Sequence, residues 1–169
     1  MPLDLTTCLL MALLFLPCVL AAPGFDQGVT IQSINVTSLW GKLSTIFETT
    51  ADIMILQETQ LVESAITTAR RTARTKGWNF WHGTPCAGGV HTRTGATASG
   101  GTKGGVAIAA KRGLAVRQIR PSPTDPDDAE FCELFSTERI IHVSVNAGSG
   151  MPRLHLVGVY GLCNPPHGK

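Results

Sequence analysis

Apolar residues are spaced in two different ways along the first half of the chain, and the spacing predicts alternating strands and helices. Residues 29–34 form a short β-rich run, and apolar residues then recur at helical spacing over 39–47, behind a cap at Thr37 or Ser38. Residues 52–56 are almost continuously apolar, which is expected of a strand covered on both faces. We therefore expect a strand, a helix and a second strand.

A second helix and a third strand are predicted next. Residues 62–76 have helical spacing and carry bases in their last turns, where cations favour the helix dipole, and Gly77 is a typical stop. Residues 78–82 (WNFWH) are typical of a strand. Residues 83–104 are rich in Gly and Thr without regular apolar spacing, which indicates a long loop.

The rest of the chain is predicted to be mostly β-structure. Residues 105–110 and 115–119 are expected to pair as two strands that turn at 111–113. Residues 139–146 and 153–160 alternate between apolar and polar positions, which predicts a β-hairpin. Alternating strands and helices followed by several strands favour an α/β (α+β) fold, a layered domain with a mixed β-sheet.

The composition is that of a folded domain. The 169 residues are 43% hydrophobic and 15% charged, and a usual domain has about 100–200 residues, so the chain is one domain or part of a larger one. The 14 basic and 12 acidic residues give a net charge of +2. That total is too near neutral to indicate a nucleic-acid or membrane partner.

Residues 1–22 differ from the rest. Positions 8–20 are an unbroken apolar run of 13 residues, which is shorter than the roughly 20 that span a bilayer, so no stable membrane span is expected. The run fits a signal peptide, although Asp4 stands where a basic residue is usual. We predict a signal peptide or apolar leader at 1–22, with a buried helix or an unrelated upstream fusion as the alternatives, and a domain at 26–169. A cleaved leader implies secretion; otherwise the protein is nuclear or cytoplasmic.

Three cysteines follow the leader, at positions 86, 132 and 163. In a secreted chain Cys86, Cys132 and Cys163 could form one disulfide and leave a free thiol, whereas an intracellular chain would keep three thiols. The cysteine count therefore leaves the compartment open.

Charge is segregated along the chain. No acid lies between Glu63 and Asp125, while ten bases fall within residues 70–120, and six of the twelve acids follow within 125–138, which overlaps a linker rich in Pro and Asp at 121–128. Such a basic block can bind the phosphates of nucleic acid in a salt-dependent way. The alternative is a set of solvated surface charges.

Two polar residues stand at the ends of the first two predicted strands. Asn35 follows the first strand and Glu58 follows the second. If these strands are parallel neighbours, their carboxyl ends meet at one edge of the sheet, where ligands bind in open α/β sheets. A carboxylate there can hold Mg²⁺, which takes one or two protein carboxylates and keeps several waters.

These residues lie within segments that resemble the endonuclease/exonuclease/phosphatase superfamily, which has the DNase I-like fold. The likeness is greatest to the apurinic-endonuclease-like domains of non-LTR retrotransposons. The matching segments stand in the family's order and cover most of residues 29–161: IQSINVTSL (31–39), ADIMILQET (51–59), GWNFWHG (77–83), GGVAIAAKRGL (104–114) and LHLVGVYG (154–161).

The resemblance implies a partial DNase I-like sandwich and a role for three residues. Asn35 and Tyr160 are implied to be catalytic, with Tyr160 contacting the scissile phosphate, and Glu58 is implied to bind Mg²⁺ or Mn²⁺. Asn164 is a weaker candidate, because the turn after Tyr160 is shifted by one residue from the family's pattern. The implied partner of the basic residues 70–120 is nucleic acid, with DNA as the expected kind.

Two further motifs of the family have no counterpart in these 169 residues. They are an Asp-x-Asn motif and a terminal Asp-His pair, which activate water and complete the metal site. Because in-line attack on phosphate needs an activated water, we expect a C-terminally truncated domain that is inactive or impaired.

Each nominated residue also has a structural interpretation. Asn35 could cap a helix or form a turn, Glu58 could be a first-turn acid of the next helix, and Tyr160 could be an ordinary strand aromatic. Asn35 also begins a glycosylation sequon, and a glycan there would obstruct the site. The competing functions are a non-catalytic nucleic-acid-binding remnant and a small secreted domain without enzymatic activity.

Overall fold

Two β-sheets packed face to face form the centre of the molecule. The computed structural model describes residues 18–20, 29–85, 104–146 and 153–161. The larger sheet has the order β1 (Cys18–Leu20), β2 (Val29–Asn35), β3 (Ile53–Gln57), β5 (Val106–Lys111), β4 (Trp78–His82). The smaller sheet has the order β6 (Ala115–Ile119), β7 (Ile140–Asn146), β8 (Leu154–Val159).

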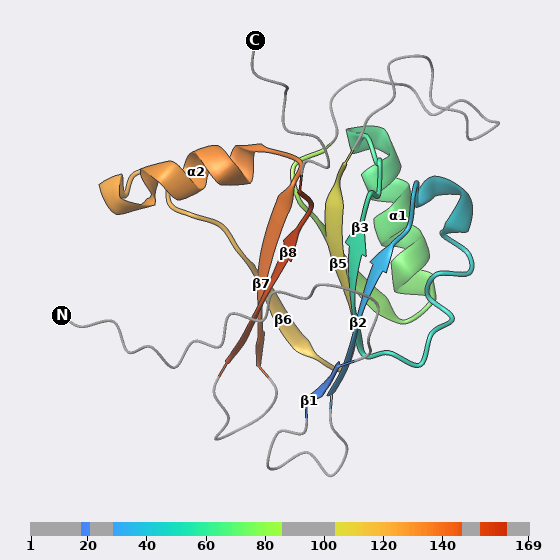
Figure 1. Ribbon diagram of the computed structural model, residues 1–169. Helices are drawn as coiled ribbons and strands as arrows, with labels where there is room; N and C mark the ends of the chain where they lie inside the picture. The colour runs from blue at the N-terminus through green and yellow to red at the C-terminus, as the bar shows by residue number, and fades with distance from the viewer. Residues whose placement is uncertain (1–17, 21–28, 86–103, 147–152, 162–169) are drawn as a thin grey trace.

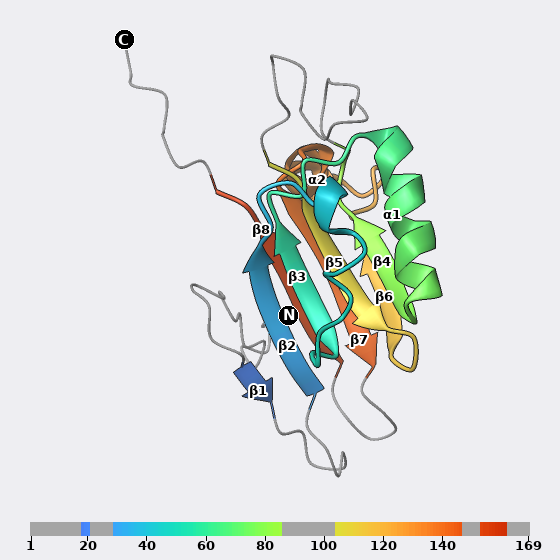
Figure 2. The same ribbon diagram turned by 90° about the vertical axis from the view of Figure 1, so that its right-hand side faces the viewer.

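Helices lie on the larger sheet and at one end of the smaller one. Helix α1 (Glu63–Thr75) and the short helix η1 (Trp40–Lys42) cover the face of the larger sheet that points away from the smaller sheet (Figures 1 and 2). Helix η2 (Pro126–Asp128) and helix α2 (Ala129–Ser136) lie at the end of β7. The chain is thus built in three layers, helix on sheet on sheet.

The larger sheet is mixed, as predicted. Strands β2 and β3 are parallel, with Asn35 opposite Gln57 at their carboxyl ends, and all other pairs in both sheets are antiparallel. The predicted fold class, a layered α/β sandwich with a mixed sheet, is confirmed. The parallel arrangement required for a shared site edge is also present.

Strands β3 and β5 supply side chains to two separate cores, because successive residues of a strand point to opposite faces. In β3, Ile53 and Ile55 pack between the two sheets, whereas Met54 and Leu56 pack under α1. The buried face of α1 is formed mainly by alanines, which lets the helix approach the sheet closely. The continuous apolar run of β3 is therefore explained by burial on both faces, as predicted.

The predicted helix at 39–47 is wrong. The segment contains only the three-residue η1 followed by turns, although Leu39, Leu43 and Phe47 are buried as their spacing suggested. Thr37 and Ser38 have positive φ angles of 41° and 75°. The backbone amides of Ser38 and Leu39 donate to the carbonyls of Glu58 and Thr59. These bonds hold the start of the segment to the neighbouring strand end, and the positive φ angles of Thr37 and Ser38 are not those of a right-handed helix.

The predicted pairing of residues 105–110 with 115–119 is also wrong. Both segments are strands, but the turn at 111–113 carries the chain from the larger sheet to the smaller one, so β5 pairs with β3 and β4 while β6 pairs with β7. The reason is burial, since every residue of β5 before Lys111 is buried, whereas β6 is exposed or half-buried.

Helix α2 was not predicted, although Phe131, Leu134 and Phe135 recur at helical spacing, and none of its residues is buried. The other predicted elements are confirmed: α1 ends before Gly77, which has a φ of +82°, β4 spans 78–82, and β7 and β8 form the hairpin. Most of the predicted loop at 83–104 and of the leader lies outside the described residues. Within the leader only β1 is described, and it pairs with β2. None of the described helices is long and apolar enough to cross a membrane.

Gly158 on β8 sets how closely the two sheets approach. A Cβ atom at this position would lie 2.7 Å from a methyl group of Val106 and 3.1 Å from methyl groups of Ile141 and Ile55. We expect Gly158→Ala to lower the free energy of unfolding by about 1–3 kcal/mol through overpacking, measured by urea denaturation. Gly113→Ala is the matched control, because no atom lies within 4 Å of a Cβ there. Equal stability of the two variants would contradict this packing.

Candidate functional site

Glu58 and Tyr160, two of the three predicted site residues, are in direct contact. Glu58 immediately follows β3 in the larger sheet, and Tyr160 immediately follows β8 in the smaller sheet. The Tyr160 hydroxyl donates a hydrogen bond of 2.8 Å to Oε1 of Glu58, across 102 residues of sequence. Beside it, the side-chain amide of Gln57 donates to the carbonyl of Val159 at 3.2 Å. The carboxyl ends of β3 and β8 are thus joined at one edge of the sandwich.

Asn35 lies at the same edge, as the last residue of β2 and opposite Gln57. Its side chain is exposed, and Oδ1 accepts hydrogen bonds from the backbone amide and hydroxyl of Thr37 at 3.1 and 3.2 Å. This is the turn that the structural interpretation of Asn35 expected. The turn occupies the amide oxygen, while the Nδ2 group donates to none of the described residues. A catalytic role for Asn35 therefore stays a prediction.

The backbone is strained at this edge. Thr37, Ser38, Glu58 and Gln60 have positive φ angles between 41° and 75°, and within the described ranges they are the only non-glycine residues with positive φ. Such conformations cost about 1–3 kcal/mol each, and they cluster at functional sites where surrounding contacts enforce them. Here the enforcing contacts are backbone hydrogen bonds from Ser38 to Glu58 and from Thr59 and Gln60 to two glycine carbonyls, those of Gly105 and Gly104.

The position of Glu58 excludes one structural interpretation. Helix α1 begins at Glu63, and Glu58 lies in the strained segment that precedes it. Glu58 is therefore not a first-turn acid of that helix. Its Oε2 oxygen accepts no hydrogen bond from any residue in the described parts of the chain, so this oxygen can take a further ligand.

A buried pair beneath Glu58 holds the segment in place. The hydroxyl of Thr59 lies 2.8 Å from Nε2 of His82, and both side chains are buried. Nδ1 of His82 lies 3.1 Å from the carbonyl of Gly83 and must donate to it, so Nε2 accepts from Thr59. Burial, with a smaller contribution from the charge of Arg70, lowers the pKa of His82 to about 4 against the raising effect of the Gly83 bond.

The structural role of His82 was not predicted. The available signal was its place in β4, where it follows Trp78 and Phe80 at alternate positions and all three are buried. With both ring nitrogens engaged, His82 has no lone pair left for a metal. Its neutral imidazole instead fixes Thr59, the residue next to Glu58.

Tyr160 is held by packing as well as by its hydroxyl. Its ring packs partly buried against the core between the sheets, and its backbone amide donates to the carbonyl of Arg139. The Arg139 guanidinium carbon lies 5.9 Å from the ring centroid. Gly104 has a φ of +105°, and a Cβ there would lie 3.5 Å from the Tyr160 ring. The interpretation of Tyr160 as a packed aromatic is thus correct, but incomplete without its bond to Glu58.

The donor set at this edge fits Mg²⁺ or Mn²⁺ bound through few protein ligands. Glu58 offers one carboxylate with an unused oxygen, and Mg²⁺ is commonly held by one or two carboxylates and several waters. Nowhere in the described ranges do three or more His, Cys, Asp or Glu side chains gather as a metal cluster. Glu58 would therefore hold the ion mainly by charge, with water completing its coordination.

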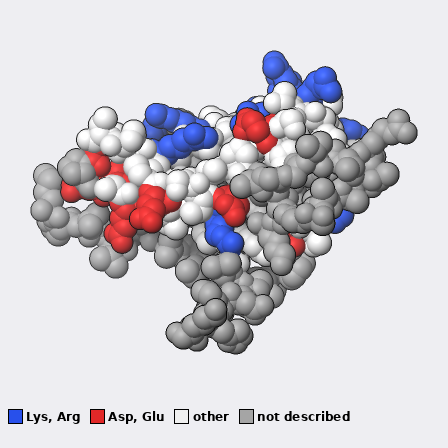
Figure 3. Space-filling view, turned by 90° about the horizontal axis from the view of Figure 1, so that it is seen from above, with Lys and Arg blue, Asp and Glu red and all other residues white. Residues whose placement is uncertain are grey.

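The basic residues of 70–120 do not form one surface. Three lie exposed on α1, outside the larger sheet, Lys76 follows at the end of that helix, and others lie on or beside β6 in the smaller sheet. Seen from above, basic side chains stand in several separate groups, and the largest group of acidic side chains lies toward the α2 end, with smaller acidic groups nearer the centre (Figure 3). Lys76 and Lys111 are paired with Glu48 and Asp52. Arg93, Lys103, Cys86, Cys163 and Asn164 lie outside the described residues.

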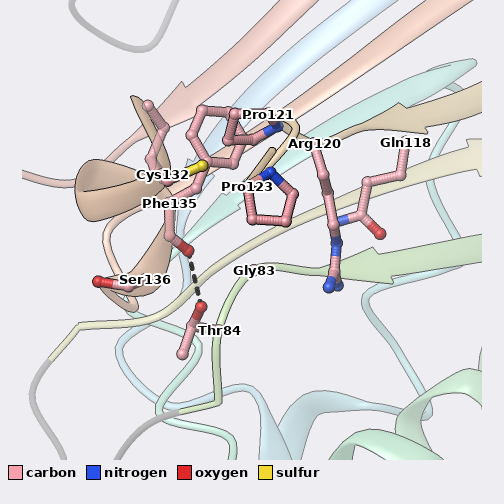
Figure 4. A pocket seen from close by; sticks show the side chains of 10 residues that line it. Gly83, Thr84, Gln118, Arg120, Pro121, Pro123, Cys132, Phe135 and Ser136 are labelled. Atoms are coloured by element: carbon pink, nitrogen blue, oxygen red, sulfur yellow. Dashed lines mark hydrogen bonds between the residues drawn. The ribbon is translucent and has the colours of Figure 1, made fainter. Parts of the chain in front are cut away.

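A hollow of about 250 Å³ lies between α2 and the end of β6. Figure 4 shows it with Cys132 and Phe135 on one side and Arg120 on the other. Two of its lining residues are joined by a hydrogen bond of 2.9 Å, which the Thr84 hydroxyl donates to the Phe135 carbonyl. None of the three predicted site residues lines it, and Cys132 is a free thiol.

No protein-family model and no curated protein matches the chain. The chain is similar to the crystal structure of an AP endonuclease from Leishmania major, with 21% sequence identity and a TM-score of 0.45. The match covers 77% of this chain and 38% of the endonuclease chain. This chain therefore corresponds to well under half of the length of that protein.

The buried His82 predicts a pH dependence of stability. The unfolded chain protonates this histidine below about pH 6.5, whereas the folded chain does so only near pH 4. The free energy of unfolding should therefore fall as the pH drops from 6.5 to 4, by up to about 3 kcal/mol. Urea denaturation across this range measures the slope, and His82→Gln should flatten it.

His142→Gln is the control for this experiment. Burial also lowers the pKa of His142, followed by the charge of His155, but the side chain is only half-buried. Its removal should flatten the profile less than removal of His82. The same slope in the native chain and the His82 variant would contradict a neutral, buried His82.

Proposed function

We propose that this chain is part of a metal-dependent phosphodiesterase of the endonuclease/exonuclease/phosphatase superfamily, acting on phosphodiester bonds of nucleic acid. The observation that carries the proposal is the hydrogen bond between Tyr160 and Glu58. The motif resemblance nominated these residues separately, from segments 102 positions apart. Their structural interpretations, taken one by one, give no reason for the two side chains to meet.

Each residue has a distinct role in this proposal. Glu58 attracts Mg²⁺ or Mn²⁺ through its unused carboxylate oxygen, while Tyr160 donates to the other oxygen and holds the carboxylate in position. When bound, the ion would neutralise negative charge on a phosphate oxygen. The Oδ1 oxygen of Asn35 is held by Thr37, and its Nδ2 donors form no bond with the described residues, so a phosphate oxygen could accept from them.

The substrate proposed is DNA, and the retrotransposon-like subtype is proposed on the sequence motifs alone. These 169 residues supply the metal carboxylate, the phenol and the amide, but no Asp-x-Asn motif and no Asp-His pair. Without those groups, none of the described side chains at the edge is assigned to activate water. We therefore propose that the 169 residues by themselves bind metal and cleave slowly or not at all.

Metal binding by Glu58 is the first test of this proposal. We expect Mn²⁺ to bind the 169-residue protein, and Glu58→Gln to weaken binding about tenfold or more, because the variant loses the charge that attracts the ion. Electron paramagnetic resonance of free Mn²⁺ measures the affinity. Glu48→Gln is the control, since Glu48 is an exposed acid paired with Lys76. Equal Mn²⁺ affinity in the native protein and the Glu58 variant would refute the metal site.

Cleavage is the second test. When supercoiled plasmid is incubated with Mg²⁺, the native protein should nick it little or not at all. Its nicking rate should be close to that of the Glu58→Gln variant. Gel electrophoresis separates nicked from supercoiled DNA and measures the rate. Robust nicking by the native chain that Glu58→Gln abolishes would contradict the expected inactivity while supporting the proposed class. Robust nicking that persists in the variant would contradict the site itself.

A further inference from the structure

A row of polar side chains crosses the outer face of the smaller sheet. Arg117 on β6 is opposite Ser144 on β7, and Ser144 is opposite His155 on β8. Val143 and Val145, on either side of Ser144, pack into the core between the sheets. Because neighbouring residues of a strand point to opposite faces, Arg117, Ser144 and His155 share the outer face.

A second hollow of about 250 Å³ lies on this face. Arg117, Arg153, Ser144 and Asn146 line it together with Ala115 and Val116, and no carboxylate is among the lining residues. Both arginines are exposed. Neither forms an ion pair with an acid in the described parts of the chain, so two positive charges face the same hollow without compensation.

Ser144 is largely buried, but its hydroxyl is accessible from the hollow that it lines. Its exposed fraction is 6%, and its hydroxyl forms no hydrogen bond with any residue that the structure describes. A hydroxyl that lines a hollow between two arginines is well placed to donate to an anion in that hollow.

The histidine beside this hollow is held in a fixed orientation. Nδ1 of His155 lies 2.9 Å from Nε2 of His142, with the ring centroids 5.1 Å apart. This contact engages one nitrogen of His155 and leaves Nε2 as the remaining one. Cross-strand neighbours have Cβ atoms about 4.5–5.5 Å apart, so His155 lies beside Ser144 at the border of the hollow.

We propose that Arg117, Arg153 and Ser144 form a phosphate-binding site on the outer face of the smaller sheet. Arginine forms paired hydrogen bonds with phosphate oxygens, and such charged hydrogen bonds are stronger than neutral ones. The site is distinct from the Glu58 edge, because Arg153 precedes β8 and Tyr160 follows it. At 3.3 Å per residue the two ends of this strand are about 20 Å apart. No divalent metal is required.

The test is titration of the 169-residue protein with inorganic phosphate, in the presence of EDTA, followed by NMR or calorimetry. Arg117→Gln combined with Arg153→Gln should weaken phosphate binding about tenfold or more. Ser144→Ala should weaken it severalfold. The control combines Arg71→Gln and Arg74→Gln, which removes the same charge from exposed positions on α1. Both double variants should keep the native thermal unfolding midpoint, because all four arginines are exposed.

A second arm distinguishes the source of the phosphate. If the site takes backbone phosphates, duplex DNA should bind less tightly to the Arg117/Arg153 variant, and inorganic phosphate should compete. If it takes only free phosphate, DNA affinity should be unchanged while phosphate binding is lost. Either result supports the site. Equal phosphate affinity in the native protein and the Arg117/Arg153 variant, or an equal loss in the α1 control, would overturn it. Because EDTA is present, failure of the Glu58 metal site does not affect the outcome.

Discussion

Burial of β3 and β5 on both faces is the constraint on which the structure depends. Helix α1 covers one face and the smaller sheet covers the other, so nearly every side chain in these strands must be apolar. Polar groups are then displaced to the ends of the strands, where the backbone leaves the core. A charged residue is tolerated at position 58 because β3 ends at Gln57 and the backbone leaves the core there. The site is thus a consequence of how completely its supporting strands are buried.

The two kinds of strand pairing in this fold bring the site together. The parallel pair β2 and β3 places Asn35 and Glu58 at one edge. The antiparallel hairpin of β7 and β8 returns the chain so that Tyr160 emerges at the same edge, and packing of the smaller sheet on the larger brings its hydroxyl to Glu58. Gly158 permits that close packing, since side chains of three strands already surround its Cα atom. Distant substitutions that separate the sheets should therefore disturb the Tyr160 contact.

Sequence patterns predicted burial better than they predicted backbone conformation. The run at 52–56 correctly indicated a strand covered on both faces, and the spacing of Leu39, Leu43 and Phe47 correctly indicated burial. The same spacing failed to show that the backbone there is a series of turns, because amides of Ser38 and Leu39 bond to a different strand end. Helix α2 was missed although Phe131, Leu134 and Phe135 recur at helical spacing, and it is a short helix of which no side chain is buried. The contact of Thr59 with His82 joins two strand ends and has no local signature.

Charge along the chain also differs from charge on the surface. The ten bases within residues 70–120 read as one block in the sequence, yet the described ones lie on both sides of the sandwich, on α1 and around β6. Arg117 has its charged neighbour in Arg153, which lies outside that block and reaches it through pairing of β6, β7 and β8. Sheet register, which brings together residues from three strands, therefore decides where anions are attracted. A count of bases in a window of the sequence therefore overestimates the positive charge on any one face of the sandwich. It also misses Arg153, which lies outside the window.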